Sequence, residues 1–171
     1  MGFGGAVADQ GWMDHRGVEV LATLARRLAE MAAIPAAVLF NEGRTLGQVE
    51  RALASGCNAV MLDTSHLPFD DNLAATRRVV ALAGPAGADV EAELGRLADA
   101  RDPASSGQPT DPREARRFVD ATGVACLAVS AGGVHILVDR EASLDLERLA
   151  ALHAAVPVPL VLHGGTSIPD R

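Results

Sequence analysis

The sequence contains no lysine and no tyrosine, so all 15 of its basic residues are arginines. Without lysine the chain cannot form a Schiff base with a carbonyl substrate, nor can it hold a nucleotide phosphate with the lysine of a P-loop. The absence of tyrosine removes a common general acid. Two widespread mechanisms, Schiff-base catalysis and P-loop nucleotide binding, are therefore excluded from the start.

Cysteine is also scarce, with only Cys57 and Cys126, each next to or within a predicted strand. No CxxC motif is present, which argues against a thiolate zinc site, and we expect two buried, reduced thiols rather than a disulfide. No apolar run reaches the roughly 18 residues of a membrane span. Residues 1–5 have neither the basic nor the apolar region of a signal peptide. These absences favour a cytoplasmic protein without a membrane partner.

The charge is acidic, because 22 aspartates and glutamates outnumber the arginines and give a formal net charge of −7. Such a charge argues against nucleic acid as a partner. The length of 171 residues and the hydrophobic content of 49% are sufficient for one substantial core. We therefore expect a single domain over residues 1–171.

Short apolar runs and amphipathic segments alternate along the chain. Apolar spacings of three and four residues predict helices over 18–31, 45–54, 71–82, 113–122 and 144–154. Apolar runs predict strands over 36–40, 58–62, 88–93, 125–130 and 160–163, with residues 5–8 as the stub of a sixth. Thr45 is the expected N-cap of the second helix, and Thr110-Asp111-Pro112 the expected start of the fourth. Residues 101–108 are expected to form an exposed loop.

This alternation predicts repeated βα units and a parallel sheet. A doubly wound sheet and a (β/α)8 barrel both fit the pattern. A complete barrel needs about 250 residues, so this chain would form an incomplete one of about five to six units. No GxGxxG or GxxxxGK[ST] motif follows a strand, which weakens the nucleotide-binding form of the doubly wound alternative. Length and spacing alone do not decide between the two.

Two of the predicted strands are followed or ended by a histidine close to glycines. In residues 125–135 two glycines precede His135, and in residues 159–165 two glycines follow His163. The carboxyl end of a buried parallel strand is where α/β folds bind ligands. Imidazole is also the commonest protein ligand of zinc. Taken alone, His135 and His163 fit hydrogen-bonded core or strand-end histidines better than they fit metal ligands.

Four segments, in a fixed order along the chain, carry a resemblance to a known family. They are Met-Leu-Asp-Thr-Ser-His at 61–66, Val-Glu-Ala-Glu-Leu-Gly at 90–95, Thr-Asp-Pro at 110–112 and Leu-His-Gly-Gly at 162–165. Together they resemble the class II, zinc-dependent ketose-bisphosphate aldolases over nearly the whole chain. The resemblance implies part of a (β/α)8 barrel, covering its third to seventh strands. It also implies retro-aldol cleavage of fructose or tagatose 1,6-bisphosphate to dihydroxyacetone phosphate and an aldose phosphate. In that family, zinc polarises the ketose carbonyl and stabilises the enediolate, which explains why no lysine is needed.

The resemblance also implies a site for zinc and for a phosphorylated sugar. His135 and His163 match the zinc histidines after the sixth and seventh strands, and Glu93 matches the glutamate of the Glu-Ala-Glu-Leu-Gly segment. Asp63, which follows a strand, is a catalytic candidate, with a backbone hydrogen bond as its structural alternative. The substrate phosphate is expected on backbone N–H groups of a glycine-rich set, namely Gly132, Gly164, Gly165 and Thr166.

The chain departs from the family pattern at the end of the third family strand. The family has Leu-Asp-His-Gly there, in which the aspartate donates a proton and the histidine binds zinc, whereas this chain has Phe40-Asn41-Glu42-Gly43. Asn41 cannot donate an acidic proton, but Glu42 could still bind zinc, because a His2Glu set is a known catalytic type.

A second departure affects the loop at residues 97–102, which lacks the glycines and the acid/base glutamate of the family, and a third is Ile136 in place of a glycine. Weakened or lost activity is therefore expected, and a non-catalytic binding or assembly protein is the alternative. The open edges of an incomplete barrel favour a homo-oligomer.

Overall fold

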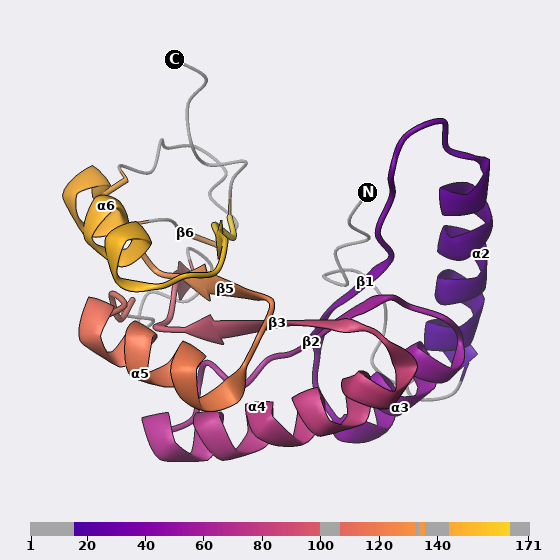
Figure 1. Cartoon of the computed structure of the whole chain (residues 1–171), viewed down its shortest axis with the longest axis horizontal. Coiled ribbons are helices and arrows are strands. Elements are labelled where there is room, and N and C mark those ends of the chain that lie inside the picture. The colour runs from indigo at the N-terminus through magenta and orange to yellow at the C-terminus, as the bar shows by residue number, and fades with distance from the viewer. Residues whose placement is uncertain (1–15, 100–106, 133, 136–143, 165–171) are drawn as a thin grey trace. The chain divides into compact units, whose positions relative to one another are not determined.

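The computed structural model describes residues 16–99, 107–132, 134–135 and 144–164 (Figure 1). Its α-helices are α2 (Val18–Met31), α3 (Leu46–Ala54), α4 (Phe69–Ala83), α5 (Pro112–Thr122) and α6 (Leu146–Ala155). Its strands are β1 (Leu39–Gly43), β2 (Ala59–Leu62), β3 (Asp89–Leu94), β4 (Ala98–Asp99), β5 (Cys126–Val129), β6 (Val134–His135) and β7 (Leu160–Val161). The predicted strand stub at 5–8 and most of the predicted loop at 101–108 lie outside the described residues.

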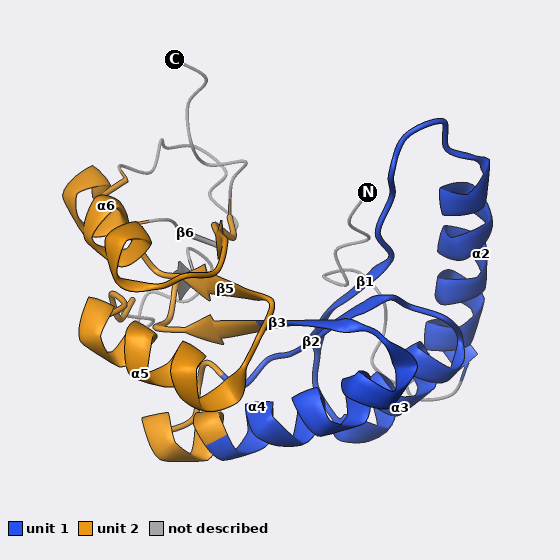
Figure 2. Cartoon of the chain, viewed as in Figure 1, with its two compact units in different colours: residues 1–64, 74–91 blue, residues 65–73, 92–171 orange. Residues whose placement is uncertain are grey.

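Five of the strands form one parallel sheet, in the order β1-β2-β3-β5-β7. The chain divides into two compact units, and β3 begins in unit 1 and ends in unit 2 (Figure 2). Unit 1 comprises residues 1–64 and 74–91, and unit 2 comprises residues 65–73 and 92–171. Strands β1 and β2 belong to unit 1, and strands β5 and β7 belong to unit 2. The predicted parallel sheet of repeated βα units is confirmed.

Helix boundaries follow the local chemistry that the sequence indicates. Helix α2 spans the predicted residues. Helix α3 begins at the predicted cap: the Thr45 hydroxyl accepts a hydrogen bond from the Gln48 amide at 3.2 Å, as an N-cap does. The Asp111 carboxylate caps α5 by accepting a hydrogen bond from the Arg113 amide at 2.7 Å, and Pro112 occupies the first turn. Capping residues in the sequence therefore predict the starts of α3 and α5.

Strand boundaries differ from the prediction in unit 1. The predicted strand at 36–40 lies at Leu39–Gly43, because regular pairing starts only where β2 supplies a parallel partner, at Leu39 opposite Ala59. Just before it, the Val38 amide donates to the Asn58 side-chain oxygen at 2.7 Å instead of to a strand.

The core of unit 1 is built from small and β-branched residues. The buried face of α2 consists of Val18, Ala22 and Ala25, and α2 packs against α3, which in turn contacts β1 and β2. Most of the large apolar residues whose spacing predicts α2 lie away from this face and are exposed to solvent, namely Val20, Leu24, Leu28 and Met31. The periodicity therefore predicts the helix, and small residues rather than large ones form its packed side.

The core of unit 2 centres on Phe118, which is fully buried on α5. Its ring meets that of Phe69 edge to face, with centroids 5.9 Å apart. The Arg117 guanidinium lies 4.5 Å from the centre of the Phe69 ring and donates a hydrogen bond to Asp70 at 2.9 Å. These contacts fix the first turn of α4 against α5.

Both cysteines are free thiols, as predicted; Cys57 is also buried as predicted, whereas Cys126 is only half-buried. Burial raises the pKa of the Cys57 thiol, which keeps it protonated and unreactive at neutral pH. No helix in the described part of the chain is both long and apolar enough to cross a membrane.

Candidate functional site

The carboxyl end of β3 carries Glu93, the carboxylate that the sequence predicts as a zinc ligand. Its side chain is buried, with the residue 6% exposed. Alternation along the strand places Glu91 and Glu93 on the same face of β3. The Asn72 side-chain amide donates to the Glu93 carbonyl oxygen at 2.9 Å. This buried bond holds the backbone of Glu93 in place, and nothing in the sequence pattern points to Asn72.

Thr110 ties the end of β3 to the end of β5. It is 1% exposed, and its hydroxyl donates to the Leu94 carbonyl and accepts from the Ser130 amide at 2.8 Å. The Ser130 hydroxyl in turn donates to the Arg96 carbonyl at 3.1 Å. The sequence marks Thr110 as the start of a helix and as part of one family segment, whereas the structure shows a buried residue whose hydroxyl connects β3 and β5.

Gly95 completes the tight end of β3. Its φ of +85° lies in the left-handed region, and a Cβ atom there would be 2.6 Å from the Thr110 hydroxyl and 2.7 Å from the Gln108 carbonyl. The backbones of Arg96 and Gln108 pair directly, with N–H···O distances of 2.8 and 2.7 Å. The glycine of the Glu-Leu-Gly segment is therefore required by close backbone packing.

His163 lies just after β7, in a turn rather than in the strand itself, and it is half-buried. The predicted strand at 160–163 ends at Val161. Gly164 follows with a φ of +69°. Gly165 and Thr166, which the sequence predicts as phosphate-binding residues, lie outside the described residues.

His135 follows β5 by way of Gly132 and lies in a further short strand, which the sequence does not predict. Strand β5 ends at Val129, and Gly132 turns the chain with a φ of +96°. His135 then lies in β6, which pairs in parallel with β4 and places His135 opposite Asp99. This small sheet was not predicted, because strands of two residues have no periodicity to detect.

In unit 1, the end of β1 contains an irregularity at Asn41 and Glu42. Phe40 pairs with Val60 and Gly43 pairs with Leu62, so two residues of β1 oppose the single residue Met61 of β2. This is the pattern of a β-bulge, a feature that often re-aims side chains next to active sites. The bulge lies at the two positions of the first departure from the aldolase pattern, Asn41 and Glu42.

Glu42 has a φ of +51°, the only positive φ of a non-glycine residue in the described part of the chain. Glutamate rarely adopts this left-handed conformation, whereas histidine and asparagine adopt it more readily. Asp63 follows β2 at the same edge, where its amide donates to the Gly43 carbonyl at 2.8 Å. The structure thus brings Asn41, Glu42 and Asp63 to the carboxyl edge of β1 and β2.

Within the described residues, no three histidine, cysteine or carboxylate side chains are grouped so that they could hold a metal ion. The side chain of His135 lies outside this part of the structure. The predicted ligand set of His135, His163, Glu93 and Glu42 therefore stays a prediction.

Comparison with known proteins gives the class of this chain. The family model for fructose-bisphosphate aldolase class II matches residues 5–171. The chain therefore belongs to the class II fructose-bisphosphate aldolase family, and its fold is that of a partial (β/α)8 barrel.

Solved structures support the assignment. The YdjI aldolase from Escherichia coli K12 is 32% identical, with a TM-score of 0.78, and the match covers 93% of this chain and 56% of that one. A putative fructose-1,6-bisphosphate aldolase from Coccidioides immitis is also 32% identical, with a TM-score of 0.77 and coverage of 86% and 54%. A fructose-bisphosphate aldolase from Campylobacter jejuni, at 21% identity and a TM-score of 0.68, shares the fold, with coverage of 88% and 50%. The chain thus spans about half the length of these aldolases.

Proposed function

We propose that this chain is an aldehyde-lyase of the class II type, in which His135, His163 and Glu93 bind zinc and which cleaves a ketose 1,6-bisphosphate slowly. The observation that carries the proposal is the placement of Glu93 and His163 within unit 2, at the carboxyl ends of two parallel strands of an aldolase-family fold. Barrel enzymes build their active sites at this edge.

The donor set has the chemistry that zinc prefers. Two imidazoles and one carboxylate form a His2Glu set, which leaves a coordination position open for a substrate. A zinc ion held there would supply Lewis-acid catalysis toward the carbonyl of the sugar phosphate. Glu42 stands where the family has a zinc histidine, and as a carboxylate it is a second candidate ligand.

The glycine turns support a role in binding phosphate. Gly132 and Gly164 have φ values of +96° and +69°. Turns that combine left-handed and right-handed residues can aim successive N–H groups at one anion. We propose that these two turns, with Gly165 and Thr166, bind a phosphate of the substrate.

Two of the family's proton-transfer residues are missing from this chain, so we expect proton transfer to be its slowest step. Asn41 has an amide where the family has a proton-donating aspartate, and residues 97–102 lack the acid/base glutamate. A general acid or base typically contributes about 10²–10⁴-fold to a rate. Asp63, at the same edge as Asn41, is the remaining carboxylate that we propose for proton transfer.

A second candidate function is a non-catalytic binding or assembly protein with an aldolase fold. The amide of Asn41 favours it, because this substitution removes an acid without changing the size of the side chain much. The two functions differ in whether any cleavage of the sugar bisphosphate occurs.

A coupled assay of dihydroxyacetone phosphate release separates the two candidates. Zinc-loaded protein is mixed with fructose or tagatose 1,6-bisphosphate, and the same protein treated with a chelator is the control. We expect cleavage that depends on zinc and is far slower than the typical enzyme rate of about 10 s⁻¹. No cleavage above the chelated control would favour the binding or assembly protein. A rate near the typical value would show that the acid and base lie elsewhere than we propose.

A further inference from the structure

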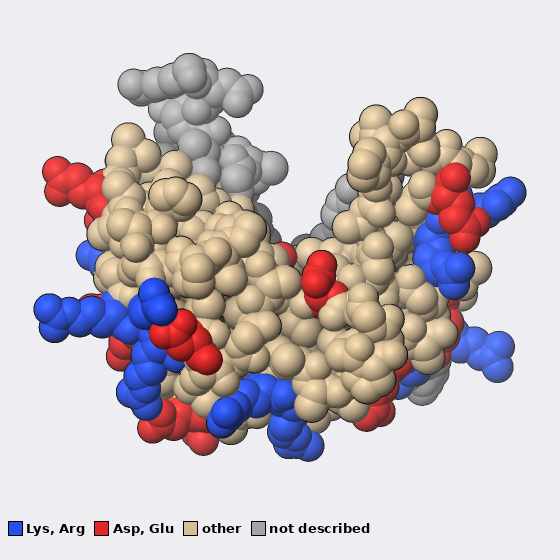
Figure 3. All heavy atoms as spheres, in the orientation of Figure 1, with Lys and Arg blue, Asp and Glu red and all other residues tan. Residues whose placement is uncertain are grey.

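Buried carboxylates are few in the described part of the chain. Figure 3 shows aspartate and glutamate side chains on the surface, over several elements. Among the acidic residues whose side chains the structure describes, only Glu91 and Glu93 are buried, and both lie on β3. Burying a carboxylate is costly unless the group is held by partners or binds a metal ion. We therefore expect the structure around Glu93 to hold this residue in one defined position.

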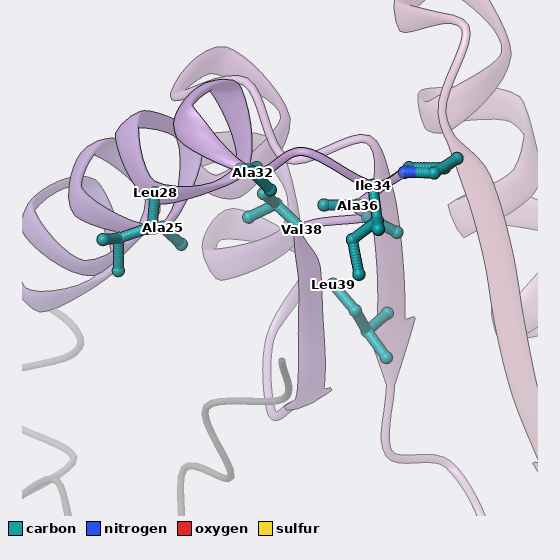
Figure 4. A pocket seen from close by; sticks show the side chains of 10 residues that line it. Ala25, Leu28, Ala32, Ile34, Ala36, Val38 and Leu39 are labelled. Carbon is teal, nitrogen blue, oxygen red and sulfur yellow. The ribbon is translucent and has the colours of Figure 1, made fainter.

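An apolar hollow in unit 1 shows the contrast. It has a volume of about 420 Å³ and lies between the second half of α2 and residues 34–39 (Figure 4). All of its lining side chains, from residues 25–39, are apolar. This hollow offers no side chain that could bind a metal ion or donate a hydrogen bond, unlike the end of β3 in unit 2.

The backbone of Glu93 continues past the neighbouring strand β2. The Asp89 amide donates to the Asn58 carbonyl at 3.0 Å, and every second residue of a paired strand faces the same neighbour. The last pair of the two strands is Met61 opposite Glu91, and β2 ends one residue later. Glu93 faces the same side but lies beyond that pair, so its buried carbonyl requires another donor.

Asn72 supplies this donor. Its side-chain amide donates to the Glu93 carbonyl at 2.9 Å, and the residue is 2% exposed. Asn72 lies in the first turn of α4, where its own backbone amide donates to the Pro68 carbonyl at 2.9 Å. The contact between Phe69 and Phe118 fixes the same turn to α5. The donor is therefore held in place by the same compact unit that contains Glu93.

The next carbonyl of β3 is held from the other side of the strand. The Thr110 hydroxyl donates to the Leu94 carbonyl, and successive carbonyls of a strand point to opposite sides. Asn72 and Thr110 therefore hold two consecutive peptide groups of β3. Because these peptide groups are fixed, the Cα–Cβ bond of Glu93 keeps one direction.

We propose that Asn72 is a positioning residue, whose amide fixes the backbone of Glu93 so that the Glu93 carboxylate is preorganised to bind a metal ion. This inference rests on the proposed role of Glu93 as a zinc ligand. A functional group must be held within about 0.5 Å of its productive position. Loss of a group that orients a metal ligand typically weakens metal affinity by about 10–100-fold. In this role Asn72 acts only through Glu93.

A cobalt(II) titration of the metal-free full chain, followed by visible absorption, tests the role of Asn72. Asn72→Leu removes the donor but keeps a side chain of similar size, and its dissociation constant for cobalt is expected to rise by about 10-fold or more. The matched control is Thr122→Val, which removes a different buried bond to a carbonyl, from the Thr122 hydroxyl to Phe118 at 2.7 Å. This control is expected to bind cobalt as the parent does. Circular dichroism checks the fold of each variant, and Asn72→Ala replaces Asn72→Leu if the leucine variant is unfolded.

A double-mutant cycle with Glu93→Gln determines whether Asn72 acts through Glu93. Glu93→Gln alone is expected to weaken cobalt binding. Adding Asn72→Leu to that variant is expected to weaken binding no further, because the ligand that Asn72 positions is already lost. If Asn72 served the fold alone, Asn72→Leu would cause the same loss in the parent and in Glu93→Gln.

The outcomes separate this inference from the proposed function. Parent-like cobalt affinity in Asn72→Leu, together with a loss in Glu93→Gln, would overturn the role of Asn72 and leave Glu93 as a ligand. An equal loss in both backgrounds of the cycle, or in Thr122→Val, would overturn it as well. A parent that binds no cobalt, or a Glu93→Gln variant with parent-like affinity, would show that Glu93 is not a metal ligand, and the proposed zinc site would then fail together with this inference.

Discussion

Thr110 and Ser130 exchange two hydrogen bonds. The Thr110 amide donates to the Ser130 carbonyl at 3.0 Å, and the Ser130 amide donates to the Thr110 hydroxyl at 2.8 Å. Both residues are buried, and the guanidinium of Arg148 adds a bond of 3.1 Å to the Thr110 carbonyl. One threonine thus joins the end of β5, the start of α5 and, through the Leu94 carbonyl, the end of β3.

Replacing Thr110 by valine tests this brace. Valine has nearly the same shape but no hydroxyl, so the Ser130 amide and the Leu94 carbonyl would lose a partner in a buried place. An unsatisfied buried polar group costs about 1–3 kcal/mol, and we expect the free energy of unfolding to fall by about that amount in a urea titration. Thr110→Ser keeps the hydroxyl and is expected to lose clearly less; equal losses in both variants would argue against the hydrogen bonds as the cause.

Gly95 is predicted to be intolerant of a side chain. In Gly95→Ala the new Cβ would meet the Thr110 hydroxyl and the Gln108 carbonyl at less than normal contact distance, in addition to the cost of a positive φ. Gly87→Ala is the matched control, because Gly87 also has a positive φ, +63°, but nothing lies within 4 Å of a Cβ there. We expect a loss of about 1 kcal/mol in the control and about 1–3 kcal/mol more in Gly95→Ala. Similar losses in urea titrations of the two variants would contradict the close packing.

The cap of α6 gives a pH dependence. The Arg148 amide donates to the Asp145 carboxylate at 2.9 Å, and this bond lowers the pKa of Asp145 below its ordinary value of 3.8. A carboxyl with a lowered folded-state pKa stabilises the fold above its unfolded-state pKa and loses this contribution as the pH falls through the folded-state value. We expect Asp145→Asn, which cannot titrate, to be less stable than the parent at pH 7. This difference should vanish when the pH is lowered below the folded-state pKa; a difference in urea midpoint that does not change with pH would show that the charge is not responsible.

The sequence predicts the features that depend on local chemistry. Thr45 and Asp111 predict the starts of two helices, because a cap needs only its own side chain and the next few amides. Four short segments in order predict the family, because a catalytic edge is assembled from successive strand ends. The parallel sheet follows from the alternation of apolar runs and helices.

Features that depend on tertiary pairing are not predictable in this way. The bulge at Asn41 and Glu42 is defined by the register of β1 with β2, which the sequence of β1 alone does not reveal. The positive φ of Glu42 is not predictable either, because glutamate is not a residue type that favours this conformation. The strand that contains His135 is short and pairs with a segment predicted as a loop. The buried role of Thr110 depends on Leu94 and Ser130, which are distant in sequence.

The bulge makes a rescue experiment structurally feasible. Asn41→Asp with Glu42→His restores the two residues that the family has at this position. Histidine fits the left-handed backbone of residue 42 better than glutamate does, so the double variant is expected to fold. We expect it to raise the release of dihydroxyacetone phosphate from fructose 1,6-bisphosphate by about 10²-fold or more, since it restores an acid. An unchanged rate would favour a binding or assembly role over a weakened aldolase.

The zinc content of the purified protein tests the central proposal most directly. Protein prepared without added metal is expected to contain about one zinc ion per chain when its metal content is measured by inductively coupled plasma mass spectrometry. His135→Ala and His163→Ala should each lose most of that zinc, whereas His153→Ala, on the exposed surface of α6, should retain it. If the parent contains no zinc, or if both site variants keep the parent's zinc content, His135 and His163 do not form the metal site of this aldolase-family chain.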